Sequence, residues 1–195
     1  LSLYNGALTK LGQPRLSALT DNVKARRELD AVYDKVVKAC LEAGQWNFAM
    51  RFVEMQASPS VSTNHGYRYV FDKPDDWLRT NALSADQYAR IPLLDYDDRA
   101  DFWLADIDTI YVRYISNDAQ YGLDLGRWPE SFTRYVEFVL ACETCEQIVT
   151  SDSKLEGLEK RRDKAFSKAS STDAMNEPAV KFMPPGRLVS SRWGG

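Results

Sequence analysis

A nucleophilic active site in this chain would have to use one histidine. His65 is the single histidine, and it stands in a stretch rich in Ser, Asn and Gly at residues 56–66. A Ser-His-Asp or Cys-His mechanism needs an imidazole held in place between its nucleophile and a third group. The composition of this stretch is typical of a mobile loop, in which a lone histidine is solvated. We therefore expect no catalysis by His65.

The cysteines could form a redox pair or a zinc site only if their surroundings fit. Cys142 and Cys145 make a C-x-x-C pair, and Cys40 stands far from them in the sequence. A redox pair opens a helix after a strand, whereas both of these cysteines fall inside a predicted helix. A structural zinc site needs four ligands, normally from two such pairs. The cysteines are therefore interpreted as small buried residues of a core helix, and their odd number suits a reducing cytoplasm.

A run of aspartates could hold calcium. Its members are Asp95, Asp97, Asp98, Asp101, Asp106 and Asp108. An EF-hand loop starting at Asp95 would need Gly at its sixth position and Glu at its twelfth, and the chain has Ala100 and Asp106 there. This motif is therefore excluded. Two interpretations stay open, a solvated acidic loop and an acidic patch that pairs with a basic surface on a neighbouring subunit.

Phosphate binding has no motif in this chain. Neither G-x-x-x-x-G-K-[ST] nor G-x-G-x-x-G occurs. The segment Lys160-Arg161-Arg162, with Lys154, Lys164 and Lys168, makes the last predicted helix basic. A charged, solvated outer face is the first interpretation of this helix, and contact with DNA is a weaker alternative.

The composition is that of an ordinary globular protein. Hydrophobic residues make up 44% of the chain and charged residues 27%, and the net charge of −3 argues against DNA binding as the main function. No apolar run approaches the roughly 20 residues that span a bilayer, so no membrane partner is expected. The chain begins at Leu1 without a methionine, so we expect its natural start to lie upstream. Its first residues lack the basic region and apolar core of a signal peptide.

Hydrophobic periodicity predicts four helices, at about residues 1–12, 22–44, 131–150 and 153–175. In the second helix Leu29, Val32 and Val36 recur in steps of three and four, and charged residues fill the other face. Ser153-Lys154-Leu155-Glu156 is a capping-box pattern that would open the fourth helix.

Strands and turns are predicted for a β-rich insertion at about residues 50–117. Tyr67, Tyr69 and Phe71 alternate with other residues. Residues 102–104 and 109–115, separated by Asp106-Ile107-Asp108, predict a hairpin. The predicted fold class is mainly α with a small antiparallel β element, α+β.

Residues 177–195 predict an extended C-terminal docking arm that follows a single domain of residues 1–176. Pro178, Pro184 and Pro185 forbid a helix, and no acidic residue occurs after Glu177. Apolar residues occur here without a regular period, namely Phe182, Met183, Leu188, Val189 and Trp193. Solvated tails are poor in such residues, so this segment is expected to dock on a partner.

Four sequence patterns follow one another along the chain, and their order and spacing indicate a family resemblance. They are Asn5 to Leu19 with its Leu11-Gly12 turn, the long helix ending in Gln45-Trp46-Asn47-Phe48-Ala49, Tyr69 to Leu78 with Pro74 and Trp77-Leu78, and Trp128-Pro129-Glu130-Ser131-Phe132 before an apolar helix. Together they resemble the head-to-tail connector adaptors of tailed bacteriophages, whose podophage version is called tail tubular protein A. The resemblance spans nearly the whole chain.

The resemblance implies a structural virion protein and not an enzyme, with no catalytic residue and no cofactor. It implies a helical bundle with a β-hairpin wing. About twelve copies would form a ring between the phage portal protein and a distal tail or nozzle protein, in keeping with the cyclic symmetry of most oligomers. The ring would continue the DNA channel, so DNA is a partner only as passing cargo. The protein would be made in the host bacterial cytoplasm and reside at the head-tail junction of the virion.

The resemblance also assigns roles to residues, because the C-terminal arm of relatives grips the portal. The expected portal-binding residues are Phe182, Met183, Pro184, Pro185, Arg187, Leu188, Arg192 and Trp193. Trp and Arg are enriched at interface hot spots, and a segment stiffened by prolines loses less entropy on docking. The double proline departs from the family pattern. A neighbouring subunit or the next tail component is expected to meet Asp95, Asp97, Asp98 and Asp101.

The alternative, from a different class, is a small cytoplasmic ligand-binding domain or enzyme with no recognisable motif. Such a protein needs a concave pocket with convergent polar groups. The sequence shows no set of residues that would form one.

Overall fold

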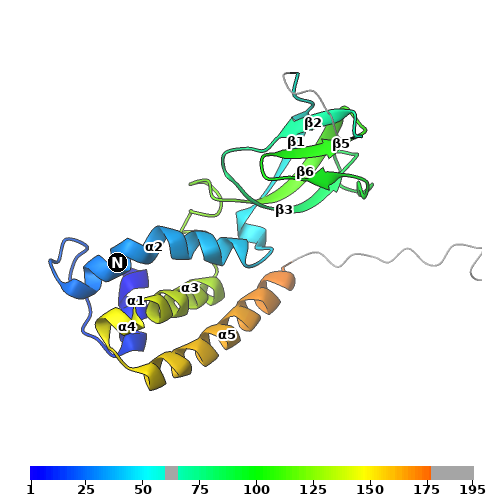
Figure 1. Ribbon diagram of the computed structural model, residues 1–195. Helices are drawn as coiled ribbons and strands as arrows, with labels where there is room; N and C mark the ends of the chain where they lie inside the picture. The colour runs from blue at the N-terminus through cyan, green and yellow to red at the C-terminus, as the bar shows by residue number, and fades with distance from the viewer. Residues whose placement is uncertain (60–65, 177–195) are drawn as a thin grey trace, which may run out of the picture.

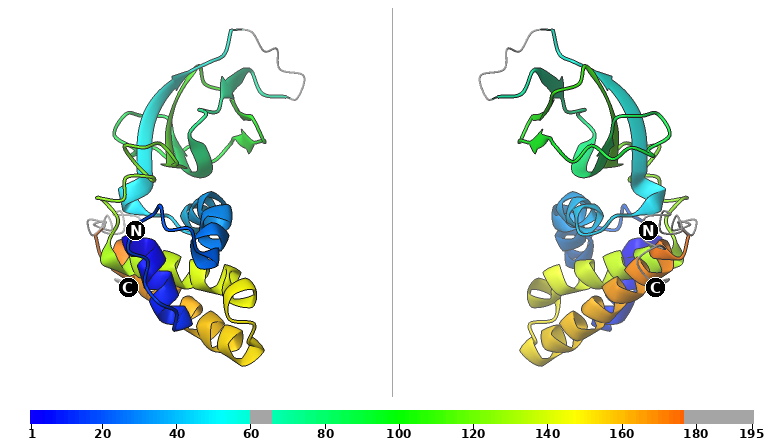
Figure 2. Two further views of the ribbon diagram at one scale, coloured as in Figure 1. Left: turned by 90° about the vertical axis from the view of Figure 1, so that its left-hand side faces the viewer. Right: turned by 90° about the vertical axis from the view of Figure 1, so that its right-hand side faces the viewer.

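The computed structural model describes residues 1–59 and 66–176, and these form an α+β fold (Figure 1). The helices are α1 (Ser2–Leu11), α2 (Lys24–Glu42), α3 (Glu130–Glu143), α4 (Cys145–Ile148) and α5 (Asp152–Ala174), with a 3-10 turn η1 (Asn47–Ala49). The strands are β1 (Met50–Gln56), β2 (Tyr69–Asp72), β3 (Trp77–Ser84), β4 (Asp97–Asp98), β5 (Phe102–Ala105) and β6 (Thr109–Ser116). The helices lie at one end of the molecule and the strands at the other (Figures 1 and 2).

The first helix ends where the sequence predicts, at a glycine. Gly12 adopts the left-handed conformation with φ 72°, which a residue without Cβ reaches at little cost. The N–H of Gly12 donates to the Thr9 carbonyl at 3.2 Å, and that of Gln13 donates to the Leu8 carbonyl at 2.9 Å. These bonds satisfy the last carbonyls of α1 and turn the chain toward α2.

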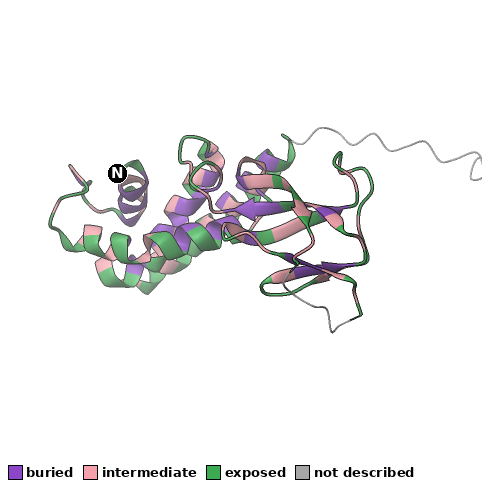
Figure 3. Cartoon of the chain, turned by 90° about the horizontal axis from the view of Figure 1, so that it is seen from above, coloured by how far each residue is buried: buried purple, intermediate pink, exposed green. Residues whose placement is uncertain are grey.

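The helices share one apolar core. α3 is its centre, because Phe132, Val136 and Leu140 are buried and α1, α2 and α5 all pack against this helix. Trp46 fills the space between α2 and α3. Its indole N–H donates to the Cys40 carbonyl at 2.9 Å, and its ring lies 4.8 Å from that of Phe132. Figure 3 shows the buried sides of the helices turned toward one another.

The helix predicted over residues 131–150 is in fact two helices. α3 stops at Glu143 and α4 occupies Cys145–Ile148. Thr144, between them, has φ −103° and ψ 2°, and both its N–H and its hydroxyl donate to the Leu140 carbonyl. A threonine hydroxyl that bonds the carbonyl four residues back weakens the regular helix, and here it accompanies the break.

The predicted capping box at the start of α5 does not form. α5 begins at Asp152, its N-cap is Ser151, and no side chain caps it. Ser153 therefore lies inside the first turn, where its hydroxyl is 3.4 Å from that of Ser151.

The predicted hairpin is wrong. β5 and β6 follow each other along the chain, but β5 pairs with β2 and β4, whereas β6 pairs with β1 and β3, all antiparallel. Ala105 lies opposite Tyr69, and Thr109 lies opposite Gln56. The three residues between the strands thus carry the chain from one three-stranded sheet to the other.

The two sheets pack face to face around a second core. Phe71 and Trp103 from one sheet and Ile110, Val112 and Tyr114 from the other are all fully buried in it. A single hairpin would leave one of its faces in water, so these large side chains favour two facing layers. Figure 2 shows the resulting two-layered β end beyond the helices.

Candidate interaction surfaces

The cysteines are not placed for catalysis. Burial raises the pKa of the Cys40 thiol to about 12 and that of Cys142 to about 11, and it also raises the pKa of Cys145. Thiols with such pKa values stay protonated at neutral pH and are poor nucleophiles and poor metal ligands. Cys142 lies one residue before the end of α3 and Cys145 opens α4, so the C-x-x-C pair spans the helix break.

Metal and histidine chemistry find no further support. Across residues 1–59 and 66–176, no group of three or more His, Cys, Asp or Glu side chains could hold a metal ion. His65 lies outside the described residues. Within the same two ranges, no helix has the length and apolar character needed to cross a membrane.

The polar cluster that most resembles an active site is centred on Asp76. Its carboxylate accepts hydrogen bonds from Arg51 at 3.0 Å, Tyr114 at 3.1 Å and Ser116 at 2.5 Å. Burial opposes ionisation of Asp76, but these hydrogen bonds outweigh it and hold the pKa of the carboxyl below its usual 3.8. The residues come from β1, β6 and the turn before β3.

This cluster is a structural joint between strands. The carbonyl of Asp76 also accepts from the N–H of Asn117, at 2.9 Å, where the chain leaves β6. Within the described part of the chain, no buried side-chain nitrogen or oxygen lacks a hydrogen-bond partner. A carboxylate that is fully engaged inside its own fold has no free position for a substrate, so the Asp76 cluster holds the β end together.

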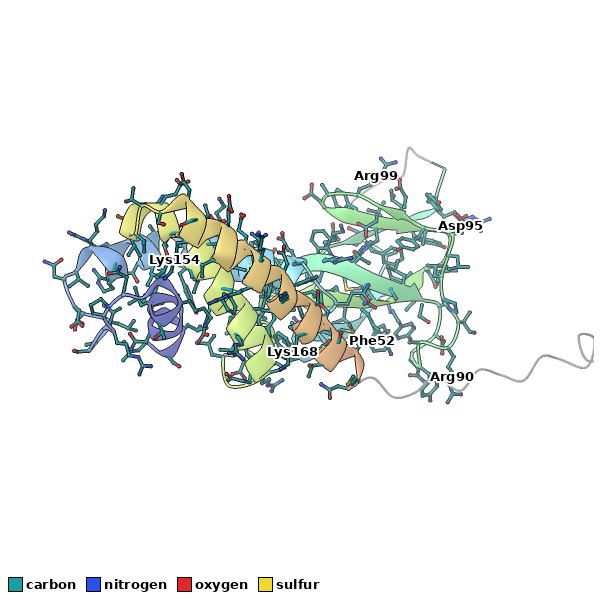
Figure 4. The ribbon with its side chains drawn as sticks, turned by 90° about the horizontal axis from the view of Figure 1, so that it is seen from below. Phe52, Arg90, Asp95, Arg99, Lys154 and Lys168 are labelled. Carbon is teal, nitrogen blue, oxygen red and sulfur yellow. The ribbon has the colours of Figure 1, made fainter. Side chains whose placement is uncertain are left out.

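The four aspartates expected to meet a partner are engaged to different degrees. Asp98 pairs with Lys73 at 2.5 Å, Asp97 pairs with Arg99 at 2.8 Å, and Asp95 accepts from the Tyr67 hydroxyl at 3.0 Å. Asp101 is exposed, and its backbone carbonyl accepts from the N–H of Lys73. Figure 4 places Asp95 and Arg99 on the β end, remote from the helices. Internal pairs therefore neutralise part of this acidic surface.

An ordered loop presents apolar side chains beside these aspartates. Between β3 and β4, Tyr88, Ile91 and Leu94 are 66%, 60% and 86% exposed. Exposed apolar patches mark interaction sites on soluble proteins, so this loop is a candidate interaction surface. Its apolar residues follow no helical or strand period, so the sequence pattern does not predict it.

Asp86 shapes this loop. Its carboxylate accepts from the N–H groups of Tyr88 at 3.2 Å, Arg90 at 2.8 Å and Ile91 at 2.7 Å, and also from the Ser84 hydroxyl at 2.8 Å. An aspartate that bonds the backbone just after itself is a common way to stabilise a turn. The loop is therefore preorganised and would lose little entropy when it docks.

A groove lies between α2 and the segment that joins β6 to α3. It has a volume of about 400 Å³ and is lined by Tyr33, Val37, Leu123 and Leu125 together with three polar residues. Leu123 and Leu125 remain 45% and 52% exposed. The lining offers apolar contact and no cluster of convergent polar groups.

The resemblance to the phage adaptors depends on residues that stand at the joints of this fold. Gly12 ends α1, and Trp46 lies between α2 and η1. Trp77 opens β3, and its indole N–H donates to the Thr80 hydroxyl at 3.1 Å. Trp128 precedes α3, and its indole N–H donates to the Gly122 carbonyl at 2.8 Å. These four residues position elements, and the three tryptophans are buried or partly buried.

The expected portal-binding residues, Phe182 to Trp193, lie outside the described residues. The described chain leads to them through the end of α5, where Asp173 is buried and Met175 is 82% exposed. Comparisons with known proteins assign no relationship, because no protein-family model and no curated protein matches this chain.

Proposed function

We propose that this protein is a structural adaptor of a tailed bacteriophage, which forms a ring between the portal and the tail. In this proposal the helices form the bundle and the two sheets form the wing of a connector subunit. Residues 177–195 grip the portal, and the assembled ring continues the DNA channel at the head-tail junction of the virion.

One observation carries the proposal. The four patterns that resemble those of the adaptors contain Gly12, Trp46, Trp77 and Trp128, which stand at successive joints of the fold. Residues that set where helices and strands meet govern the arrangement of the whole chain, so a resemblance at all four positions supports the proposal of a common architecture. Fold alone does not imply function, and the surfaces must also fit.

The surfaces agree with a protein that works by recognition. The described residues present exposed apolar side chains on an ordered loop and in a shallow groove. The polar side chains around Asp76 form hydrogen bonds with one another inside the fold. These features favour binding to other proteins over the alternative of a small enzyme or ligand-binding domain.

Portal binding by substituted full-length chains tests the proposal. We expect Phe182→Ala combined with Trp193→Ala to weaken binding to the portal ring, since removing a hot-spot side chain costs about 2 kcal/mol or more. Leu94→Ser, which changes an exposed apolar residue at the β end, is the matched control and should bind like wild type. Equal portal binding by the wild type, the double variant and the control would show that residues 177–195 do not form the portal contact.

A further inference from the structure

The two flanks of α5 carry opposite charges. At about 100° per residue, Lys160, Arg161, Lys164 and Lys168 fall within one sector of roughly 100° around the helix. Asp152, Glu156, Glu159 and Asp163 fall within another sector of about 60°. We refer to these two sets as the basic flank and the acidic flank. All eight residues are exposed.

One small residue, Ser167, separates the flanks on the outward side of α5. Ser153 and Ser171 are also exposed and fall within the sector of the basic flank, whereas Leu158, Ala165 and Ala169 face the core. Figure 4 views the helix from this outward side, with Lys154 near its beginning and Lys168 near its end. The centres of the two flanks lie about 120° apart around the helix, so they face different directions on its exposed half.

Most of these charges have no partner within the described chain. Arg162, at the edge of the core face, pairs with Glu159 at 3.9 Å and with Asp163 at 3.0 Å. Lys160, Arg161, Lys164 and Lys168 form no ion pair with any described residue, and neither do Asp152 and Glu156. The segregation therefore does not serve pairing along α5 itself, where opposite charges four residues apart would do so.

Neighbouring helices extend each flank with charge of the same sign. On one side, Arg134 of α3 lines a shallow cleft together with Lys168 and Thr172. The same cleft contains one acid, Glu130. On the other side, Glu143 of α3 and Glu159 both lie near Cys142. Burial raises the pKa of this thiol most, Arg162 lowers it, and the two glutamates raise it. The opposite charges thus cover two sides of the helical end.

We propose that α5 is the contact between copies of this chain, with the basic flank of one copy against the acidic flank of the next. Opposite potentials across an interface steer association and fix the register of the partners. Since the flanks point to different sides, each copy meets two neighbours. Such a heterologous contact generates a ring when the rotation between neighbouring copies closes.

This inference deepens the proposed function, on which it rests, by naming the surface that joins the subunits of the ring. The small side chains of Ser153, Ser167 and Ser171 on the outward side of α5 allow close approach of two helices. An isolated exposed ion pair contributes about 0–1 kcal/mol, so the flanks set orientation, and apolar contacts must supply much of the affinity.

Zero-length carbodiimide crosslinking of the full chain tests the contact, because it couples only lysines and carboxylates that already touch. A mixture of ¹⁴N- and ¹⁵N-labelled protein distinguishes links between copies from links within one copy. At low ionic strength we expect a ladder that extends beyond dimers. Mass spectrometry should find the links between Lys160, Lys164 or Lys168 of one copy and Asp152 or Glu156 of another. High salt should suppress the ladder.

Charge reversal sharpens the test. Lys164→Glu with Lys168→Glu cancels the net charge of the basic flank, and Asp152→Lys with Glu156→Lys cancels the net charge of the acidic flank. Each double variant alone should lose the ladder. An equal mixture of the two should restore it, because contacts between the two variants again bring opposite charges together at the reversed positions. The matched control is Lys35→Glu with Lys38→Glu, which reverses two exposed lysines of α2 and should leave the ladder unchanged. Circular dichroism verifies that each variant is folded.

Three results would overturn the inference. They are the absence of links between copies, a ladder that stops at dimers, and a ladder that charge reversal leaves intact. Salt-sensitive DNA binding that the Lys164→Glu, Lys168→Glu variant loses, without any link between copies, would assign the basic flank to nucleic acid instead. Portal binding tests the proposed function separately. Portal binding without flank-dependent links between copies would refute only the inference about α5. Flank-dependent links without portal binding would refute only the proposal that the protein is an adaptor.

Discussion

Asn47 and Asp173 hold each other through two hydrogen bonds although 126 positions separate them in the chain. The N–H of Asn47 donates to Asp173 Oδ2 at 2.9 Å, and the Asn47 side-chain amide donates to the Asp173 carbonyl at 3.0 Å. Asp173 is only 6% exposed. This pair fixes the end of α5 against the junction between α2 and β1.

Breaking this pair should destabilise the protein and loosen the end of α5. Asp173→Ala leaves the N–H of Asn47 without its acceptor, which costs about 1–3 kcal/mol for a buried donor. Urea unfolding measures the loss, and hydrogen exchange should show faster exchange over the last turn of α5. Glu156→Ala, on the exposed side of the same helix, is the control and should change stability by less than about 0.5 kcal/mol. Equal stabilities would show that the pair contributes nothing.

Asp76 should make stability depend on pH in the acid range. Its pKa in the folded protein lies below the usual 3.8, so ionised Asp76 stabilises the fold at every pH above that value. The contribution is lost as the pH falls through the lower folded pKa. Asp76→Asn should be less stable at pH 7 and should show a flatter decline between about pH 5 and pH 2. Asp75→Asn, an exposed neighbour, should follow the wild-type curve.

The cysteines should react with thiol reagents in an order set by burial. Cys142 is half-buried, whereas Cys40 and Cys145 are buried. At pH 8 in the native protein we expect slow modification of Cys142 and none of the other two, because burial keeps all three thiols protonated. Mass spectrometry of partly modified protein identifies the site. Rapid modification of Cys40 without unfolding would contradict the packing of α2 on α3.

The loop that Asp86 organises should lose its order without that carboxylate. In Asp86→Ala the N–H groups of Tyr88, Arg90 and Ile91 lose their acceptor, and their hydrogen exchange should accelerate while the helices keep wild-type protection. Asp101→Ala removes an exposed carboxylate of the same β end and should leave the loop unchanged. If exchange in the loop stayed slow in Asp86→Ala, the backbone alone would determine its shape.

Local patterns predicted the helices well because their signals lie within one turn. The apolar spacing of Leu29 and Val36 and the glycine stop at Gly12 place α2 and α1 within two residues of their observed bounds. The break at Thr144 escaped prediction, since the apolar pattern continues through Cys145 and Ile148. The hydrogen bond from the Thr144 hydroxyl to the Leu140 carbonyl does not change the hydrophobic pattern of the sequence.

Strand pairing could not be predicted because its partners are distant in the chain. The short spacing between β5 and β6 suits a hairpin. The two strands nevertheless belong to different sheets, because Trp103 and Tyr114 are buried only when the two sheets face each other. The Asp76 cluster likewise joins Arg51, Tyr114 and Ser116 from separate strands, and no local motif marks it. Among the candidate interaction surfaces, the sequence pattern predicted the aspartates near Asp95. It did not predict the ordered loop around Asp86.

The most direct test of the adaptor proposal is to mix the full-length protein with portal rings of the same phage and image the complexes by electron microscopy. The proposal predicts a second ring stacked on the tail-facing end of the portal, coaxial with its channel, with density from the C-terminal segment of each subunit on the portal surface. Portal rings that remain bare at saturating protein concentration would contradict it.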